Sequence, residues 1–490
     1  MLTIPEHNHT LKPGLKGYSA KAYFKFICLS SFGIFAFFMN FPLPNYQLSV
    51  FGWQFGTVSA NSTMLVTHLT GLIRAALWSG NFKAMPAIIW LFGVYCLYDI
   101  FILRFNSCWK TTNLARIFSV FKTLGFILLT FTILNYYFGI HPALFDWYFA
   151  GRDFIGGAGI AFFVMDRILI SISITIPLAA AFLPFLTGYG LVDFVGVIVR
   201  RVMRPVFRLP GRAAVIAVSA LLASFVVGHI AANNEYKSGY MTQRESMIIA
   251  TSLTSASIGF MLVLAQNTNI MHIWNIYLWS TFLIVLVVTI ICARIYPLSK
   301  IPNTYREGVT PIPEKIYTDH ITRYAVKEAL ETASKADDFG KRLAGIMKET
   351  LGVLGTCATG STFFSAVGIV LYMYTPILTW VGYIFVPFML IAIPQSEVMT
   401  ASSGAALSFI EITLPSLLVA TGEWSLRIRY MMAVVPVTAV VFLASWVPCI
   451  MATSLPVKFS HLIIIWLQRM ILSIIITSLF ALVLFPAGAV

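Results

Sequence analysis

Residues 272–296 read H-I-W-N-I-Y-L-W-S-T-F-L-I-V-L-V-V-T-I-I-C-A-R-I-Y, a run with a single charged side chain, Arg294. A helix needs about 20 mostly apolar residues to cross the hydrocarbon core of a bilayer. This stretch is therefore predicted to be a transmembrane helix. Similar runs recur almost to the end of the chain, and they predict further spans at 24–42, 84–103, 117–138, 168–188, 247–265, 351–374, 429–453 and 462–486.

The composition excludes an ordinary soluble protein. Of the 490 residues, 58% are hydrophobic and 11% are charged, and the mean hydropathy is +0.84. A soluble domain carries roughly a quarter charged residues. The 33 Lys and Arg against 19 Asp and Glu would suggest a nucleic-acid partner in a soluble protein, but here they are typical of basic cytoplasmic loops. We expect an all-α polytopic membrane protein that binds no nucleic acid.

Basic residues also predict the orientation. Residues 1–23 are expected to form a cytoplasmic tail, followed by an N-terminal transmembrane region over 24–166. Within that region, segment 60–78 carries Arg74 and many polar groups, which favours an interfacial helix over a lipid-facing span. An arginine cluster without any acid marks a second cytoplasmic, interfacial segment, and it consists of Arg200, Arg201, Arg204, Arg208 and Arg212.

One charged connector divides the rest of the chain. Residues 297–349 are read as the one solvated loop, because 17 of the chain's 52 charged residues lie between Lys300 and Glu349. The loop separates a first half at 167–296 from a second half at 350–486. Within the connector, Lys327, Glu331 and Lys335 follow at i,i+4, a spacing that predicts an exposed helix. Thr318 or Asp319 is expected to cap it.

The two halves are related in sequence. At an offset of 184, Leu209-Pro210 aligns with Ile393-Pro394 and Ser224-Phe225 with Ser408-Phe409. Residues 193–212 and 297–349 both look cytoplasmic, yet three apolar segments separate them. One segment must therefore enter the membrane and return.

The best candidate for the returning segment is 213–232, and its partner in the second half is 396–422. Three crossings plus a re-entrant hairpin in each half predict two inverted-topology repeats, the arrangement that many secondary transporters use.

Polar residues near these hairpins are the predicted site, because irregular backbone at membrane depth needs protein or water partners. Glu397 and Glu411 lie in an apolar context and are predicted to couple a cation or contact substrate. Replacing Glu397 by Gln is then expected to uncouple or abolish uptake. The residues predicted to bind the solute are Ser224, Asn233, Asn234, Thr254, Ser255, Gln395, Ser402 and Ser403.

Structural roles remain open for each of these groups. Glu397 and Glu411 could lie at the water interface or pair with Arg427 or Arg429. Hydroxyl groups in a helix often bond to the carbonyl of the preceding turn. His229, alone on an apolar face, fits a structural role as well as a titrating one.

Two stretches resemble a known family. From Gly228 to Met261 the chain reads G-H-I-A-A-N-N-E-Y-K-S-G-Y-M-T-Q-R-E-S-M-I-I-A-T-S-L-T-S-A-S-I-G-F-M, and I-P-Q-S-E and F-I-E-I-T-L-P begin at Ile393 and Phe409. These residues resemble the YjiH family of bacterial inner-membrane proteins, over about residues 20–486. The resemblance implies a nucleoside-recognition or Gate domain, similar to parts of concentrative nucleoside transporters, ferrous-iron transporters and spore-maturation proteins.

One departure bears on the solute. Relatives carry a Gln and an acidic residue in the span matching Val434 to Val447, where this chain has Thr438-Ala439 and Ser445-Trp446. If those groups bind ligand in the relatives, the difference implies that this protein recognises another solute, aromatic or larger.

We therefore predict a secondary transporter of a small polar organic solute, nucleoside-like in class, which works by alternating access and is coupled to H⁺ or Na⁺. It is expected in the bacterial inner membrane with a cytoplasmic N-terminus, without cofactor, metal site or catalytic residues; a homo-oligomer is compatible with the sequence. The alternative is a non-transporting assembly or signalling factor, resembling spore-maturation Gate proteins, whose contact site is the helix around 318–349. An intramembrane hydrolase fits least well, because no nucleophile motif is present.

Overall fold

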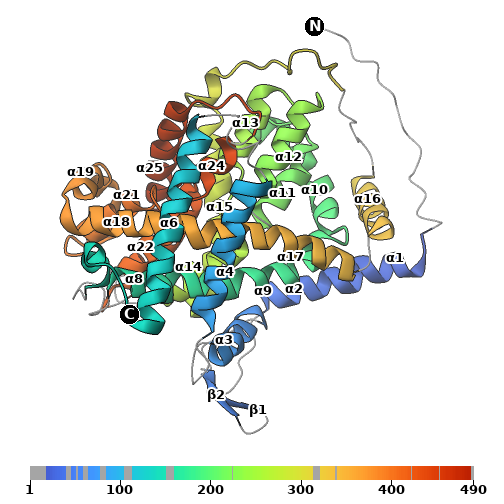
Figure 1. Ribbon diagram of the computed structural model, residues 1–490. Helices are drawn as coiled ribbons and strands as arrows, with labels where there is room; N and C mark the ends of the chain where they lie inside the picture. The colour runs from blue at the N-terminus through green and yellow to red at the C-terminus, as the bar shows by residue number, and fades with distance from the viewer. Residues whose placement is uncertain are drawn as a thin grey trace.

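The computed structural model describes residues 18–39, 46–50, 53–58, 65–77, 84–103, 113–150, 159–222, 225–312, 320–336, 339–420, 422–451 and 453–486. Apart from one small β-hairpin, the regular elements in these ranges are helices (Figure 1). The all-α membrane fold is therefore confirmed.

Within the described ranges, seven helices are long and apolar enough to cross a membrane. They are Ala20–Phe38, Met85–Ile102, Arg116–Phe138, Ile160–Thr187, Met271–Cys292, Phe339–Tyr374 and Phe459–Leu484. Large apolar side chains on these helices are exposed, such as Leu91 at 58% and Val483 at 82%, as expected where a helix faces lipid. The protein is a multi-pass membrane protein.

The N-terminal region contains the hairpin and several of the spans. Its elements are α1 (Ala20–Phe24), η1 (Lys25–Leu29), α2 (Ser30–Phe38), β1 (Tyr46–Val50), β2 (Trp53–Val58), α3 (Leu65–Leu77), α4 (Met85–Tyr98), η2 (Asp99–Leu103), α6 (Asn113–Phe138), η3 (Ala143–Phe145), α7 (Asp146–Phe149) and α8 (Ile160–Phe163). Strands β1 and β2 pair antiparallel; the sequence analysis does not predict them.

Three polar residues of α3, His68, Thr70 and Arg74, contact the rest of the protein or are buried. Arg74 lies 3.2 Å from the Asp166 carboxylate, and His68 and Thr70 are buried. The hydroxyl of Thr70 donates to the Val66 carbonyl at 2.8 Å. These contacts, together with the packing of α3 on α9 (Ser171–Thr187), account for polar groups that lipid would not tolerate.

The two halves run through a comparable, though not identical, order of helices. The first contains η5 (Val164–Ile170), α9, α10 (Leu191–Val202), η6 (Met203–Phe207), α11 (Ala213–Leu222), α12 (Phe225–Lys237), α13 (Gln243–Ser252), α14 (Ile258–Asn267), η7 (Met271–Ile273), α15 (Trp274–Cys292) and η8 (Leu298–Lys300). The second contains η9 (Cys357–Ser361), α18 (Thr362–Tyr374), α19 (Ile377–Tyr383), α20 (Val386–Met389), α21 (Val398–Leu407), α22 (Leu414–Leu418), α23 (Leu426–Ala439), α24 (Trp446–Met451) and α25 (Phe459–Leu484). This order of elements is consistent with the predicted repeat of two related halves. That the second half is inverted relative to the first stays a prediction.

Each half contains a helical hairpin. Helices α11 and α12 fold back on each other. A Cβ added at Gly228 of α12 would lie only 2.9 Å from the Cβ of Ala220 of α11. Eight residues along a straight helix would separate those positions by about 12 Å. In the second half, α21 and α22 are joined by a short turn and pack together. We call these pairs hairpin 1 and hairpin 2.

Each half also contains an interrupted helix, which differs from the continuous spans predicted at 247–265 and 429–453. The first interruption, Leu253–Ser257, separates α13 from α14, and Ser257 restarts the helix by accepting a hydrogen bond from the Phe260 amide. The second, Val440–Ser445, separates α23 from α24. There Pro436 lacks an amide donor, and Val440 has a left-handed backbone with φ of 50°. A hydropathy window averages over such breaks.

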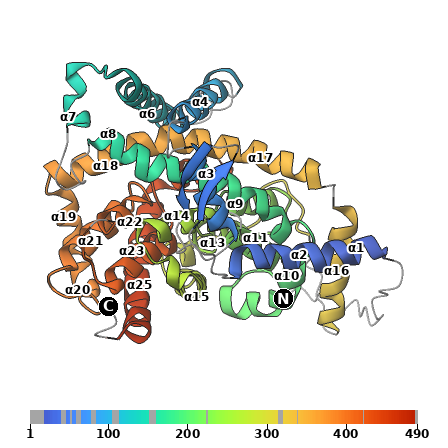
Figure 2. The same ribbon diagram turned by 90° about the horizontal axis from the view of Figure 1, so that it is seen from below.

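The connector carries a helix that packs against the first half. Helix α16 (Ile321–Lys335) lies against α10, while α17 (Phe339–Thr356) continues into α18 as one long helix that passes α4 and α6 (Figures 1 and 2). The predicted pair of Lys327 and Glu331 is present at 3.8 Å. The expected caps, Thr318 and Asp319, lie outside the described residues.

Helix α16 contributes both apolar and charged contacts to this interface. Its alanines Ala325, Ala329 and Ala333 are buried, and Glu328 lies 3.6 Å from Arg200 of the arginine cluster. Burial also raises the pKa of the Asp193 carboxyl on α10, and a hydrogen bond with Thr332 opposes that shift. The connector is therefore partly a packed element and not only a solvated loop.

Replacing Gly190 by Ala is expected to detach α16. Gly190 has φ of 96°, and a Cβ there would lie 2.3 Å from the Ala329 carbonyl oxygen. Backbone strain and overpacking together should destabilise the protein by about 3 kcal/mol, measurable as a lower Tm and faster proteolysis within α16. Gly308 is the matched control, because its φ is 76° but nothing lies within 4 Å. Equal losses in both variants would show that the packing at Gly190 adds nothing.

Candidate functional site

The two interrupted helices meet at one buried arginine. Arg469 on α25 is 0% exposed. Its Nη1 donates to the Ser252 carbonyl at 2.8 Å, and its Nε donates to the Ala439 carbonyl at 3.2 Å. A further bond runs from Nη2 to the Thr438 carbonyl. Ser252 ends α13 and Ala439 ends α23, so one guanidinium joins the C-terminal ends of both interrupted helices.

Hairpin 1 covers the first interruption. The His229 ring lies with Nε2 3.0 Å from the Ala250 carbonyl, and the Thr254 hydroxyl donates to the same oxygen at 3.3 Å. The Ser255 hydroxyl donates to the carbonyls of Ala256, at 3.0 Å, and Leu221, at 3.4 Å. Thr254 and Ser255 are also fully buried, and their hydroxyl groups bond to backbone carbonyls. Contact of these two residues with a solute stays a prediction.

Hairpin 2 covers the second interruption in a comparable way. The Leu443 amide donates to the Phe409 carbonyl at 2.8 Å, and the Ala444 amide donates to the Ile410 carbonyl at 3.2 Å. Backbone groups released by the break are therefore bonded to the turn of the hairpin. Such pairing is required wherever irregular backbone lies at membrane depth.

Glu411 lies in that turn and is enclosed. Its side chain is 1% exposed. The Ser361 hydroxyl donates to Oε2 at 3.1 Å, and the Thr413 hydroxyl donates to Oε1 at 3.2 Å. Among the described residues, no cationic side chain forms an ion pair with this carboxylate. Ser361 belongs to the π-helical turn η9, and π-helical turns are frequent at functional sites.

Glu397 is placed differently. It is partly exposed at the start of α21. The Ser425 amide donates to Oε1 at 3.0 Å, and the Ser425 hydroxyl donates to Oε2 at 2.5 Å. Ser425 is the N-cap of α23. Glu397 therefore ties hairpin 2 to the beginning of the interrupted helix, and in the described part of the chain neither Arg427 nor Arg429 forms an ion pair with it.

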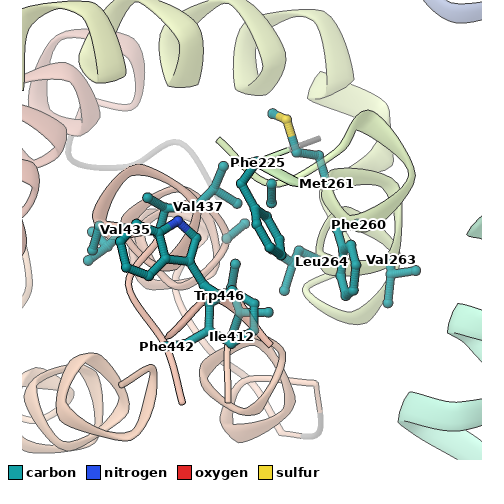
Figure 3. Packing of buried hydrophobic residues seen from close by; sticks show 14 of the residues in the cluster. Phe225, Phe260, Met261, Val263, Leu264, Ile412, Val435, Val437, Phe442 and Trp446 are labelled. Carbon is teal, nitrogen blue, oxygen red and sulfur yellow. The ribbon is translucent and has the colours of Figure 1, made fainter. Parts of the chain in front are cut away.

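Aromatic side chains from both halves meet where hairpin 1 contacts the second interruption. Figure 3 shows Phe225, from hairpin 1, beside Phe442 and Trp446, from the second interruption and α24. The ring centroids of Phe225 and Phe442 are 5.8 Å apart, and those of His229 and Trp446 are 4.9 Å apart. We call His229, Phe225, Phe442 and Trp446 the aromatic cluster.

The aromatic cluster holds two unused polar atoms. His229 Nδ1 and Trp446 Nε1 are buried and have no hydrogen-bond partner among the described residues. Leaving such a group unpaired costs about 1–3 kcal/mol. The two rings meet edge to face, with an interplanar angle of 79°, so each half brings one unpaired nitrogen to the same buried contact, where a polar group could form hydrogen bonds.

The remaining predicted residues are scattered. Asn233 is buried, and its Oδ1 accepts from the Ser454 amide at 2.9 Å. Ser402 and Ser403 are buried in α21, and the Ser402 hydroxyl lacks a partner in the described ranges. Asn234 and Gln395 are exposed, and Ser224 lies outside the described residues. Their role in binding a solute stays a prediction.

Arg469 is the residue that the sequence analysis missed. It is the only charged residue in the run 462–486. Because an ionisable residue inside a span is functional by default, that isolation was the available signal. For metals, no group of three or more His, Cys, Asp or Glu gathers anywhere in the described ranges.

Comparison with known proteins places a family match on the first half. Residues 169–271 match the model of the Gate family, described as nucleoside recognition. The matched region runs from the start of α9 to η7, so it includes hairpin 1 and the first interrupted helix. The chain thus contains a Gate-like region.

Relatives and solved structures resemble a larger part of the chain. An uncharacterized protein of Alkalihalophilus pseudofirmus is 30% identical over 314 residues, which cover 63% of this chain and 66%, just under two thirds, of that relative. A structure of CNTnw in an inward-facing substrate-bound state is 12% identical with a TM-score of 0.42, covering 87% of this chain and 100% of that one. An outward-facing CNTnw double variant is 11% identical with a TM-score of 0.39, covering 94% and 98%.

Proposed function

We propose that this protein is a secondary transporter of a small polar organic solute, nucleoside-like in class, which works by alternating access. We also propose that it belongs with the YjiH-like Gate proteins and lies in a bacterial inner membrane with its N-terminus in the cytoplasm. The observation that carries the proposal is the meeting of two interrupted helices, one from each half, at a single buried centre around Arg469.

Unwound backbone at membrane depth needs hydrogen-bond partners. Interrupted helices leave carbonyl and amide groups that lipid cannot satisfy, so they persist where protein or a water-filled path supplies partners. In secondary transporters such helices form the solute and ion site near the bilayer midplane, at the interface of the repeats. Here each interruption is held by the hairpin of its own half, so movement of one half against the other would open the centre without breaking those bonds.

The solute class follows from the aromatic cluster. Aromatic rings offer stacking surfaces, and the free nitrogens of His229 and Trp446 offer one hydrogen bond each. A planar heterocycle that bears polar groups satisfies both requirements. The match of residues 169–271 to a nucleoside-recognition model supports the same class.

Coupling by a proton is assigned to Glu411. Burying a charged carboxylate without a cationic partner is costly, so we propose that Glu411 takes up a proton when the site closes. Glu397, also predicted for coupling, is the weaker candidate, since it is partly exposed and both of its oxygens accept from Ser425.

A thermal-shift screen is the first test of the solute. Purified protein in detergent is melted with nucleosides, bases, amino acids, dipeptides and amines. A specific solute at a hundredfold excess over Kd should stabilise the protein by about 2.7 kcal/mol. Uptake of that solute into liposomes under a proton gradient then tests transport. A protein that stays folded and responds to none of these classes would contradict the proposal.

The assembly-factor alternative gains no support from the connector. The apolar face of α16, which such a partner would bind, already packs against α10.

A further inference from the structure

We propose that Arg469 is a resident cation that takes the place of a coupling sodium ion at the joint of the two interrupted helices. The consequence, which rests on the proposed function, is that transport by this protein does not depend on Na⁺. The inference thereby excludes Na⁺ as a coupling ion beside the proton assigned to Glu411.

The guanidinium of Arg469 lies where a coupling cation would be expected to bind. Its three carbonyl partners belong to Ser252, Thr438 and Ala439, the C-terminal residues of α13 and α23. Carbonyls at a helix C-terminus carry a partial negative charge. In transporters with discontinuous helices, those ends are where a coupling cation is coordinated. Arg469 therefore places its positive charge within a cage formed by these three carbonyl oxygens.

The positive charge of Arg469 is permanent. An arginine side chain stays protonated in proteins, so its charge cannot be removed by titration at ordinary pH. Among the described residues no carboxylate forms an ion pair with Arg469, which leaves the carbonyl dipoles as its partners. A sodium ion in the same cage would meet an uncompensated positive charge a few ångströms away. The cage is therefore closed to Na⁺ while Arg469 is in place.

The guanidinium is also held firmly. Arg469 is 0% exposed and points between the two halves. One of its acceptors, the Ser252 carbonyl, also accepts from the Thr289 hydroxyl at 2.6 Å. A planar fork that donates to three fixed carbonyls loses little freedom for each bond formed. The side chain thus behaves as a built-in part of the site, whereas a coupling ion must enter and leave.

The test compares melting of the purified protein in sodium chloride and in choline chloride at equal ionic strength. We expect the Tm of wild type to be the same in sodium chloride and in choline chloride. The same should hold for R469K, which retains a cation, whatever its own Tm. In choline chloride, the Tm of R469A should be lower than that of wild type by on the order of 10 °C. In sodium chloride, the Tm of this variant should be higher by on the order of 5 °C than in choline chloride. R469Q, which keeps part of the hydrogen bonding, serves if R469A does not fold.

The matched control is R294A. Arg294 also donates to two carbonyls, those of Ile290 and Pro205, but it is exposed at the end of α15. Its loss should create no response to Na⁺. The proposal is overturned if wild type is stabilised by Na⁺ over choline, or if the folded neutral variants melt alike in the two salts.

Uptake into liposomes separates this inference from the proposed function. Uptake that is equal in sodium and choline supports both. Uptake that requires Na⁺ overturns the resident cation and leaves the transporter intact. Absence of uptake for every solute that binds, with the melting behaviour as expected, contradicts the transporter and leaves the cation site standing.

Discussion

Replacing Glu411 by Gln is expected to lower proton-driven uptake by roughly 100-fold and to remove its pH dependence, which corresponds to a coupling free energy at the upper end of the usual range. Wild-type uptake should rise as the external pH falls at constant internal pH, because protonation of Glu411 accompanies closure of the site. Glutamine cannot exchange a proton, so its uptake should be flat across the same range. Initial rates in liposomes, measured as a function of external pH, give both quantities.

The amide should keep the turn folded. Its oxygen can accept from Thr413, as Oε1 does now, and its nitrogen faces the Ser361 hydroxyl, which can rotate to accept. We therefore expect the free energy of unfolding to change by no more than about 1 kcal/mol. A large loss of stability would mean that uptake fails for structural reasons.

Glu397 is the matched comparison, because it lies in the same hairpin region but on its partly exposed side. The E397Q variant should reduce uptake modestly through its bonds to Ser425 and keep the pH dependence. If E397Q loses the pH dependence and E411Q keeps it, the assignment of the two carboxylates must be reversed.

The long spans could be predicted from the sequence, and the interruptions could not. Apolar runs such as 117–138 and 462–486 coincide with single helices, because transfer from water to lipid is set by composition over about 20 residues. The breaks at Leu253–Ser257 and Val440–Ser445 depend on partners distant in the sequence. The Phe409 and Ile410 carbonyls that receive the amides of Leu443 and Ala444 are an example. No local pattern reports such a partner.

Only part of the candidate site could be predicted from the sequence, because some of its residues matter through partners that are distant in the chain. Glu411 could be singled out because a carboxylate in an apolar segment is costly unless it has a function. Arg469 carries an equally clear signal, but its meaning depends on where two helices end in space. The unpaired nitrogens of His229 and Trp446 become visible only when hydrogen bonds are counted in the folded protein. The sequence alone does not show which buried nitrogen atoms lack a hydrogen-bond partner.

The second large effect is expected from replacing Trp446 by Phe. The Trp446 ring is fully buried and its Nε1 has no acceptor among the described residues. Phenylalanine keeps a ring against His229 and removes the unpaired donor. The gain of about 1–3 kcal/mol from removing an unsatisfied group should offset the smaller ring volume. Stability without solute should therefore change little, while the affinity for a nucleoside-like solute that accepts this hydrogen bond falls about tenfold or more.

The matched control for this change is W466F. Trp466 is also buried with an unpaired Nε1, but its ring packs against Phe385 and Phe409 and not against His229. Both variants should therefore melt within a few degrees of wild type, because each loses the same indole nitrogen from an apolar setting. Only W446F should weaken binding, measured as the solute concentration that gives half of the thermal shift. Equal affinities in W446F and wild type would place the solute away from the aromatic cluster, and a loss confined to W466F would move the site toward the turn of hairpin 2.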